Sequence, residues 1–114
     1  MEDCIFCKLA NGVIPTDLVY EDDTVAAFND LSPVAPVHIL IVPKAHIAST
    51  LEINDENSSV VGHIFSVASK IAKEKGFGEN GFRVVNNCGK DGGQTVGHLH
   101  FHLLAGRNLE WPPG

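Results

Sequence analysis

Three histidines alternate with apolar residues near the C-terminus, and their spacing suggests chemistry. His98, His100 and His102 are separated by Leu99 and Phe101. Successive side chains of a β-strand point to opposite faces, so the three imidazoles would stand in a row about 7 Å apart while the apolar side chains face a core. Such a row suits a solvated polar face, a metal site, or covalent catalysis with an imidazole as the nucleophile.

Two of the three cysteines form a second cluster with chemical potential. Cys4 and Cys7 have the C-x-x-C spacing, which in a reducing compartment indicates metal binding or redox chemistry. The third cysteine, Cys88, stands alone in a glycine-rich stretch, where we expect an ordinary reduced thiol. An odd number of cysteines argues against a disulfide framework.

Composition limits the classes of protein and partner. The 114 residues suit one domain over residues 1–114, with 44% hydrophobic and 19% charged residues, as in globular proteins. A formal charge of -6 argues against nucleic-acid binding, which needs a basic patch. The sequence has neither a run of roughly 20 apolar residues nor the basic-then-apolar start of a signal peptide. We therefore expect a cytoplasmic protein that does not bind membranes.

The histidine run must be positioned by a sheet, and the hydrophobic pattern predicts one. Apolar runs predict five strands, at residues 18–21, 24–28, 38–42, 82–86 and 98–104. Helical spacing predicts a long helix over 57–75, capped by Asn54 or Asn57 and stopped by Gly76, and a short helix over 3–11 capped by Asp3. Strands in meander order with one inserted helix predict an α+β fold with an antiparallel sheet.

A glycine-rich loop over 87–96 leads directly into the histidine run. Its backbone N–H groups can curl around a phosphate, which the chain would then place beside His100.

His63 falls on the polar side of the long helix and is expected to be an ordinary surface residue. Trp111 lies in an irregular tail, where it is either anchored or used at an interface.

Several motifs together resemble the histidine triad (HIT) family. The run His-Leu-His-Phe-His-Leu-Leu at 98–104 matches the family signature. Similar stretches cover nearly the whole chain: Cys-Ile-Phe-Cys-Lys at 4–8, Tyr-Glu-Asp-Asp-Thr-Val-Ala-Ala-Phe-Asn-Asp at 20–30, Ala-Pro-Val-His-Ile-Leu-Ile-Val-Pro-Lys at 35–44 and Asp-Gly-Gly-Gln-Thr-Val at 91–96. The ending, Gly-Arg-Asn-Leu-Glu-Trp-Pro-Pro-Gly at 106–114, is similar to the Hint branch in particular.

The resemblance implies a HIT-like fold with about five antiparallel strands, one long helix and a short N-terminal helix. It also implies a homodimer that binds purine nucleoside monophosphates and hydrolyses their phosphoramidates and related adenylates. In that reaction His100 would attack the α-phosphorus, and water would then hydrolyse the nucleotidyl-histidine. The alternatives are a dinucleoside-polyphosphate hydrolase of the Fhit branch, a nucleotide-binding or zinc-binding protein with incidental turnover, and a metalloenzyme that uses all three histidines of the run.

The resemblance also assigns site residues at matching positions. The implied catalytic set is His100 with His102, His38 and His98. Either His38 or a backbone carbonyl would fix the tautomer of His100, and His102 would donate to a phosphate oxygen or to the leaving group. The implied nucleotide site has an apolar slot for the base, formed by Phe6, Phe28, Leu31 and Ile39. Asp30 is the implied ribose-binding acid. The implied phosphate-binding positions are Asn87, Gly93, Gln94 and Thr95.

The C-x-x-C distinguishes this chain from metal-free Hint relatives. Its resemblance to family members with the same spacing implies a Zn2+ ion held by Cys4, Cys7, His46 and His98. Two thiolates and two imidazoles make a closed tetrahedral set, so we expect a structural site that holds the N-terminal segment against the histidine run.

Overall fold

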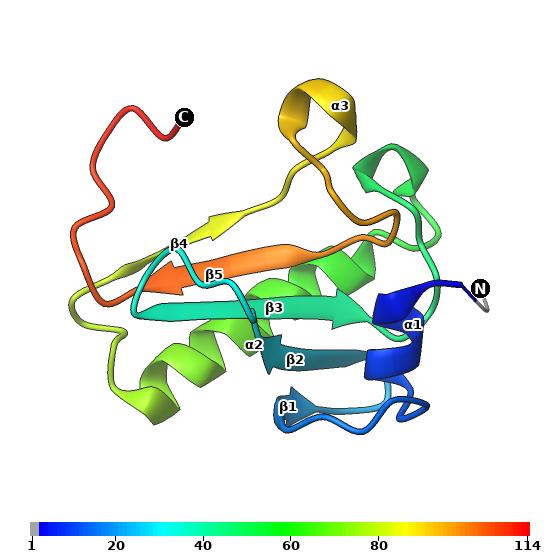
Figure 1. Cartoon of the computed structure of the whole chain (residues 1–114), viewed down its shortest axis with the longest axis horizontal. Coiled ribbons are helices and arrows are strands. Elements are labelled where there is room, and N and C mark those ends of the chain that lie inside the picture. Colours follow the sequence, from blue (N-terminus) through cyan, green and yellow to red (C-terminus); the bar gives the residue numbers. More distant parts are fainter. Residues whose placement is uncertain (1–2) are drawn as a thin grey trace.

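The computed structural model describes residues 3–114, which form a five-stranded antiparallel sheet with the order β1-β2-β3-β5-β4 (Figure 1). The strands are β1 (Leu18–Glu21), β2 (Val25–Asn29), β3 (Val37–Pro43), β4 (Phe82–Val85) and β5 (Phe101–Ala105). The α+β class and the antiparallel sheet are confirmed. Strand β3 pairs on both sides, with β2 and with β5, as its continuous apolar sequence predicts.

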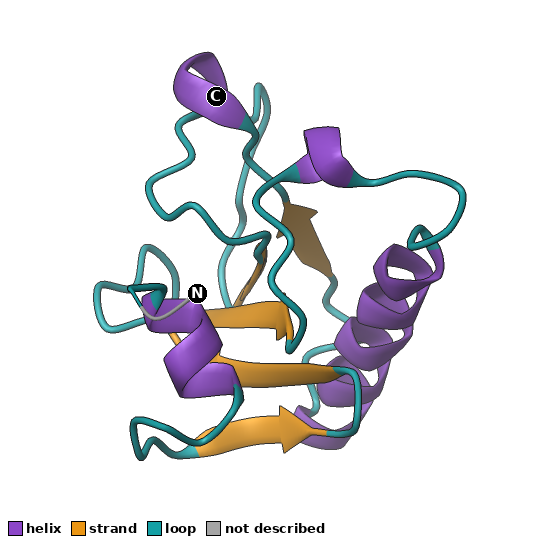
Figure 2. Cartoon of the chain, turned by 90° about the vertical axis from the view of Figure 1, so that its right-hand side faces the viewer, coloured by secondary structure: helices purple, strands orange, loops and turns teal. Residues whose placement is uncertain are grey.

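Helices cover both faces of the sheet (Figure 2). The long helix α2 (Ser59–Lys75) packs on one face, and the short helix α1 (Ile5–Ala10) packs on the other. Strand β3 therefore supplies both cores: Ile39 and Ile41 under α2, and Leu40 and Val42 under α1. None of the helices described between residues 3 and 114 is long and apolar enough to cross a bilayer.

Helix α2 lies close to its expected limits. Its buried side chains recur at helical spacing: Val60, Ile64, Val67, Ala68, Ile71 and Ala72. Gly76 ends the helix with a φ of 83°, a conformation that glycine adopts at little cost. The expected capping by Asn54 or Asn57 is wrong. These side chains accept each other's backbone N–H in the preceding turn, and Ser58 takes the N-cap position.

Three other local elements differ from expectation. Helix α1 is capped by Cys4, whose Sγ accepts a hydrogen bond from the backbone N–H of Cys7 at 3.3 Å, and not by Asp3. The glycine-rich loop contains a one-turn helix, α3 (Gly89–Gly92), and a 3-10 turn, η1 (Thr50–Glu52), follows β3. Single turns carry no hydrophobic period, so the sequence pattern does not reveal them.

The histidine run is only partly a strand. Strand β5 begins one residue after His100, so His98 and His100 precede it and only His102 lies within it. The alternation nevertheless continues through the run, because the three apolar side chains that alternate with the histidines are all buried in the core under α2: Leu99, Phe101 and Leu103. The apolar side of the predicted pattern is therefore confirmed, although the strand is shorter than predicted.

The turn between β1 and β2 is joined to α2 by Asp22. Oδ1 of Asp22 accepts the backbone N–H groups of Thr24 and Val25 at 2.8 and 2.9 Å. Oδ2 lies 3.0 Å from the hydroxyl of Tyr20 and 2.6 Å from Nε2 of His63. Burial opposes ionisation, yet these hydrogen bonds outweigh it and lower the pKa of Asp22 well below its usual range. His63 lies at the surface as expected, with 40% of its side chain exposed, but it is also part of this hydrogen-bonded cluster.

We expect this cluster to make stability depend on pH. A carboxyl whose pKa is lowered by folding stabilises the protein above its unfolded-state pKa, near 4, and loses that contribution as pH falls. Asp22→Asn should lower the free energy of unfolding at pH 7 by about 1–3 kcal/mol and should flatten its decrease below pH 4. Urea denaturation between pH 3 and pH 7 measures both effects, with Asp23→Asn as the control. An Asp22→Asn variant with the wild-type pH slope would contradict the prediction.

Candidate active site

His100 is oriented by the backbone of the segment that carries it. Its ring is buried, and Nδ1 lies 2.7 Å from the carbonyl oxygen of His98. A carbonyl only accepts hydrogen bonds, so Nδ1 carries the proton and Nε2 keeps its lone pair. Of the two partners expected for this ring, the structure selects the backbone carbonyl and not His38. The ring also packs edge-on against Phe6, with 5.1 Å between ring centroids.

His38 and His102 form a chain of hydrogen bonds with a defined direction. The backbone N–H of Val34 donates to Nδ1 of His38 at 3.1 Å, so neutral His38 carries its proton on Nε2. That Nε2 lies 2.9 Å from Nδ1 of His102 and 3.4 Å from Oδ2 of Asp30. Donation to His102 leaves the proton of His102 on its own Nε2. His102 thus offers a donor, with its ring centroid 5.1 Å from that of His100.

Burial favours the neutral form of His102. It lowers the pKa of His102, and the proximity of His100 and His38 lowers it further, whereas Asp30 acts in the opposite direction. A neutral imidazole has one donor nitrogen and one acceptor nitrogen, which the direction of the hydrogen-bond chain requires.

The two histidines His100 and His102 line a cavity of about 320 Å³. Besides them, the lining contains five of the predicted nucleotide-binding side chains: Phe6, Phe28, Asp30, Leu31 and Thr95. An apolar slot with a few polar groups at one end is typical of a small-molecule site. The other predicted catalytic and nucleotide-binding residues lie outside the lining: His38, His98, Asn87, Gly93 and Gln94.

The prediction that Ile39 lines the apolar slot is wrong. Ile39 is 1% exposed and lies in the core under α2, where it is paired with Leu103. The next residue, Leu40, is paired with His102 and lines the cavity instead. Because side chains alternate across a strand, an error of one residue exchanges the two faces.

The glycine-rich loop is held in shape by Gln94. Its amide nitrogen donates to the carbonyl oxygens of Ala48 and Val96 at 2.8 and 2.9 Å. Its Oε1 accepts the backbone N–H of Gly89 at 3.0 Å. Both amide hydrogens are thereby used, so the Gln94 side chain has no free donor to offer a phosphate in this arrangement. The next residue, Thr95, is the one that lines the cavity.

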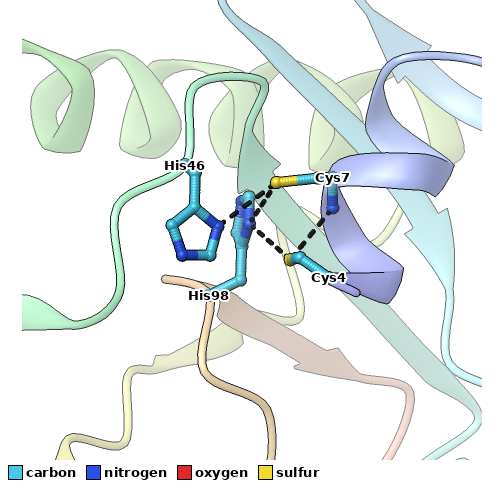
Figure 3. Close-up of side chains that lie close together, drawn as sticks. All are labelled: Cys4, Cys7, His46 and His98. Atoms are coloured by element: carbon cyan, nitrogen blue, oxygen red, sulfur yellow. Dashed lines mark hydrogen bonds between the residues drawn. The ribbon is translucent and has the colours of Figure 1, made fainter. Parts of the chain in front are cut away.

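The side chains of Cys4, Cys7, His46 and His98 come together (Figure 3). Sγ of Cys4 lies 3.1 Å from Nδ1 of His98. Sγ of Cys7 lies 3.2 Å from Nδ1 of His46 and 3.4 Å from Nδ1 of His98. Burial, together with the nearby Cys4, raises the pKa of the Cys7 thiol. A cation is the partner that would favour its thiolate form.

These four donor atoms fit a tetrahedral metal ion. All of them lie within 4.8 Å of one another, and bonds of about 2.3 Å to sulfur and 2.0 Å to nitrogen would place such donors roughly 3.3–3.8 Å apart. Nε2 of His98 donates to the carbonyl of Pro43 at 2.9 Å, so the Nδ1 that faces the cysteines carries a lone pair. Burial lowers the pKa of His98, although that hydrogen bond opposes the effect. A neutral imidazole is the form that binds metals.

A second cluster of donor atoms does not fit a metal. Asp30, His38 and His102 bring donors within 4.8 Å of one another, but Nδ1 of His38 already accepts a backbone N–H. Its Nε2 must therefore keep a proton and cannot ligate. The histidines of the run do not converge either, because Nδ1 of His98 faces the cysteines and Nδ1 of His100 faces the carbonyl of His98. The geometry therefore disfavours the metalloenzyme alternative.

Asn86 contacts the histidine run and Thr50 contacts Asn86, and neither residue is among the sequence-based site predictions. Nδ2 of Asn86 donates to the carbonyl oxygen of His100 at 2.9 Å, and the hydroxyl of Thr50 donates to Oδ1 of Asn86. Asn86 directly follows β4, the neighbour of β5 in the sheet, so its polar side chain at a strand end was a usable signal. Thr50 carried no such signal, because it comes from a turn that the pattern does not predict.

Comparison with known proteins agrees with this geometry. Residues 11–109 match the HIT domain family. The purine nucleoside phosphoramidase of Escherichia coli K12 is 45% identical over 108 residues, which are 95% of this chain and 91% of that protein.

Two solved structures share the fold over almost their whole length. A histidine triad protein from Clostridium difficile is 63% identical with a TM-score of 0.94 and covers 96% of each chain. A HIT family hydrolase from Legionella pneumophila is 47% identical with a TM-score of 0.94, over 98% of this chain and 100% of that one. The chain therefore belongs to the histidine triad (HIT) family of hydrolases.

Proposed function

We propose that this protein hydrolyses purine nucleoside 5'-phosphoramidates and related adenylates through a nucleotidyl-histidine intermediate on His100. The observation that carries the proposal is the tautomer of His100. With Nδ1 donating to the carbonyl of His98, the lone pair of Nε2 is left on a ring that lines the cavity, close to the donor of His102. A neutral imidazole held in this way is a ready nucleophile for phosphorus.

Two displacements at phosphorus follow from this arrangement. In the first, the Nε2 lone pair of His100 forms an N–P bond while the P–N bond of the substrate breaks. The leaving nitrogen takes the bonding pair and is protonated, with water as the ultimate proton source. The Nε2–H of His102 donates to the phosphoryl oxygen or to the leaving group, where negative charge develops. In the second, water forms an O–P bond while the N–P bond to His100 breaks and its bonding pair returns to Nε2. The proton released by the water balances the one taken up by the leaving nitrogen, so His100 is neutral again.

The rest of the cavity is proposed to select the nucleotide. Phe6, Phe28 and Leu31 provide an apolar slot for a purine base, and Thr95 provides a donor at the phosphate end. Oδ1 of Asp30 accepts the backbone N–H of Ser32 at 2.7 Å, which holds the carboxylate at the cavity. Carboxylate oxygens suit a 2',3'-diol. Phosphate contacts by Gly93, Gln94 and Asn87 stay predictions.

We propose that Cys4, Cys7, His46 and His98 hold a structural Zn2+ ion. A closed set of two thiolates and two imidazoles leaves no open position for substrate, so the ion would supply folding free energy and no chemistry. Phe6 lies between the two cysteines in the sequence and packs against Phe28 and His100 in space. The site would therefore fix one wall of the base slot.

A dinucleoside-polyphosphate hydrolase is the second candidate. A hollow of about 450 Å³ shares Ile5, Thr95 and Val96 with the cavity. This hollow leaves room for a leaving group larger than an amine.

We also propose that residues 1–114 act as one domain in a cytoplasmic homodimer. Strand β4 lies at the edge of the sheet, where Phe82 is 40% exposed, and Trp111 in the tail is 79% exposed. Unpaired strand edges and exposed aromatic side chains are common features of interfaces. We do not propose a nucleic-acid partner, because a net charge of -6 disfavours binding to a phosphate backbone.

Replacing the nucleophile should abolish turnover and spare binding. His100→Ala should lower kcat for a fluorogenic adenosine phosphoramidate by roughly a thousandfold or more, because no other group can form the intermediate. Calorimetry should still detect AMP binding. His63→Ala, which alters a histidine outside the cavity, is the control. Wild-type protein that binds AMP but cleaves only a diadenosine polyphosphate would favour the second candidate, and substantial turnover by His100→Ala would exclude the proposed intermediate.

The ribose assignment is tested by comparing two nucleotides. Asp30→Ala should weaken AMP binding by about tenfold and 2'-deoxy-AMP binding by much less, because only AMP presents both hydroxyls to the carboxylate. Equilibrium binding is the measurement of choice, since Asp30 also lies near His38 and its loss affects turnover in other ways. Equal losses for the two nucleotides would remove the assignment.

The metal site is tested with a matched pair of cysteine variants. Cys4→Ser should lose the one zinc ion per chain and lower Tm by about 5 °C or more, because the ion contributes to folding. Cys88→Ser, at the cysteine outside the cluster, should keep both the zinc and the Tm. Elemental analysis and thermal unfolding of the same samples provide the readout. Wild-type zinc content in Cys4→Ser would refute the ligand set.

A further inference from the structure

The backbone that carries His100 lies just beyond the hydrogen-bonded part of the sheet. Pairing between β4 and β5 ends at Val85 and His102, and pairing between β3 and β5 ends at Ile41 and Phe101. His100 therefore sits past the end of both ladders. Its backbone polar groups need partners other than neighbouring strands, since buried polar groups are almost always paired.

The side chain of Asn86 provides the hydrogen bond to His100 that a neighbouring strand would otherwise make. The His100 carbonyl accepts from Nδ2 of Asn86 at 2.9 Å, one residue after the last ladder pair on β4. A carbonyl can only accept, so the orientation of the Asn86 amide is defined and its Oδ1 faces away from His100. That Oδ1 accepts the hydroxyl hydrogen of Thr50, the first residue of η1. The side chain of Asn86 thus links η1 to the backbone of His100.

The same segment is anchored once more from the chain between β3 and η1. The backbone N–H of Leu99 donates to the carbonyl of Ile47 at 2.6 Å. The His98–Leu99 peptide is therefore held by Ile47, and the His100–Phe101 peptide by Asn86 with Thr50. Together with the bond from Nδ1 to the carbonyl of His98, these contacts define both the backbone and the ring of His100.

We propose that Thr50 and Asn86 are positioning residues for the nucleophile. The hydroxyl of Thr50 orients the Asn86 amide, and that amide fixes the peptide plane after His100 so that Nε2 points at the phosphorus. Neither residue lines the cavity, so they act through His100 and not through the nucleotide. The inference rests on the proposed function, in which the direction of the Nε2 lone pair limits the rate.

The test compares Thr50→Val, which keeps the shape and removes the hydroxyl, with Thr50→Ser, which keeps the hydroxyl. Thr50→Val should lower kcat for the adenosine phosphoramidate by about 10- to 100-fold, because a small misplacement of a reacting group has effects of this size. KM and the Kd for AMP should not change. Thr50→Ser should keep kcat within about threefold of wild type. A loss of kcat that is equal in both variants, or a loss that appears in KM, would overturn the proposal.

A second readout does not depend on turnover. Nitrogen-15 NMR of the imidazoles reports the tautomer and the order of His100. Wild type and Thr50→Ser should show one sharp Nδ1–H tautomer, and Thr50→Val should show an averaged or broadened signal with an unchanged fold by circular dichroism. An unchanged His100 signal in Thr50→Val would overturn the proposal. If the wild type did not cleave phosphoramidates, the proposed function would fail, while this comparison would still decide the role of Thr50.

Discussion

The active site depends on one hydrogen bond, from Nδ1 of His100 to the carbonyl oxygen of His98. It joins residues two apart in an extended segment, so the backbone that presents the imidazole also selects its tautomer. A side-chain partner could change protonation state or swing away, whereas a carbonyl can do neither. The nitrogen proposed as the nucleophile is thereby defined before any ligand binds, and such preorganisation is what a catalytic imidazole requires.

The hydrogen-bonded pairing of β5 with its neighbours ends just before the proposed site residue His100. Within the sheet, β3 and β5 are held by regular pairing and by the core under α2. The segment that precedes Phe101 lies outside the strand pairing, and contacts from side chains and short turns hold it instead. His102, the last histidine of the run, still lies in the sheet, whereas His100 lies outside it. The proposed donor and the proposed nucleophile are thus held by different kinds of structure, although they are two residues apart.

Much of this arrangement could be predicted from the sequence, because the relevant signals were periodic. The apolar alternation around the histidines identified the buried side of the run, and the helical period identified α2. The C-x-x-C and the family resemblance identified four residues that the structure brings together. The errors lie at positions that neither a period nor a motif marks. The prediction placed Ile39 at the cavity, where the structure has its neighbour Leu40. The contacts of Thr50 and Asn86 depend on a single turn that the pattern does not predict.

His98 contributes to the neighbouring nucleophile with its main chain, and to the cysteine cluster with its ring. Every amino acid has that main-chain oxygen. The side chain at position 98 can therefore vary in evolution without disturbing the tautomer of His100, provided that the chain keeps its path. The proposed metal cluster and the imidazole proposed as the nucleophile, although close in the sequence, are therefore separable. A lineage that lost the proposed ion and its ligands would keep the backbone bond that orients His100.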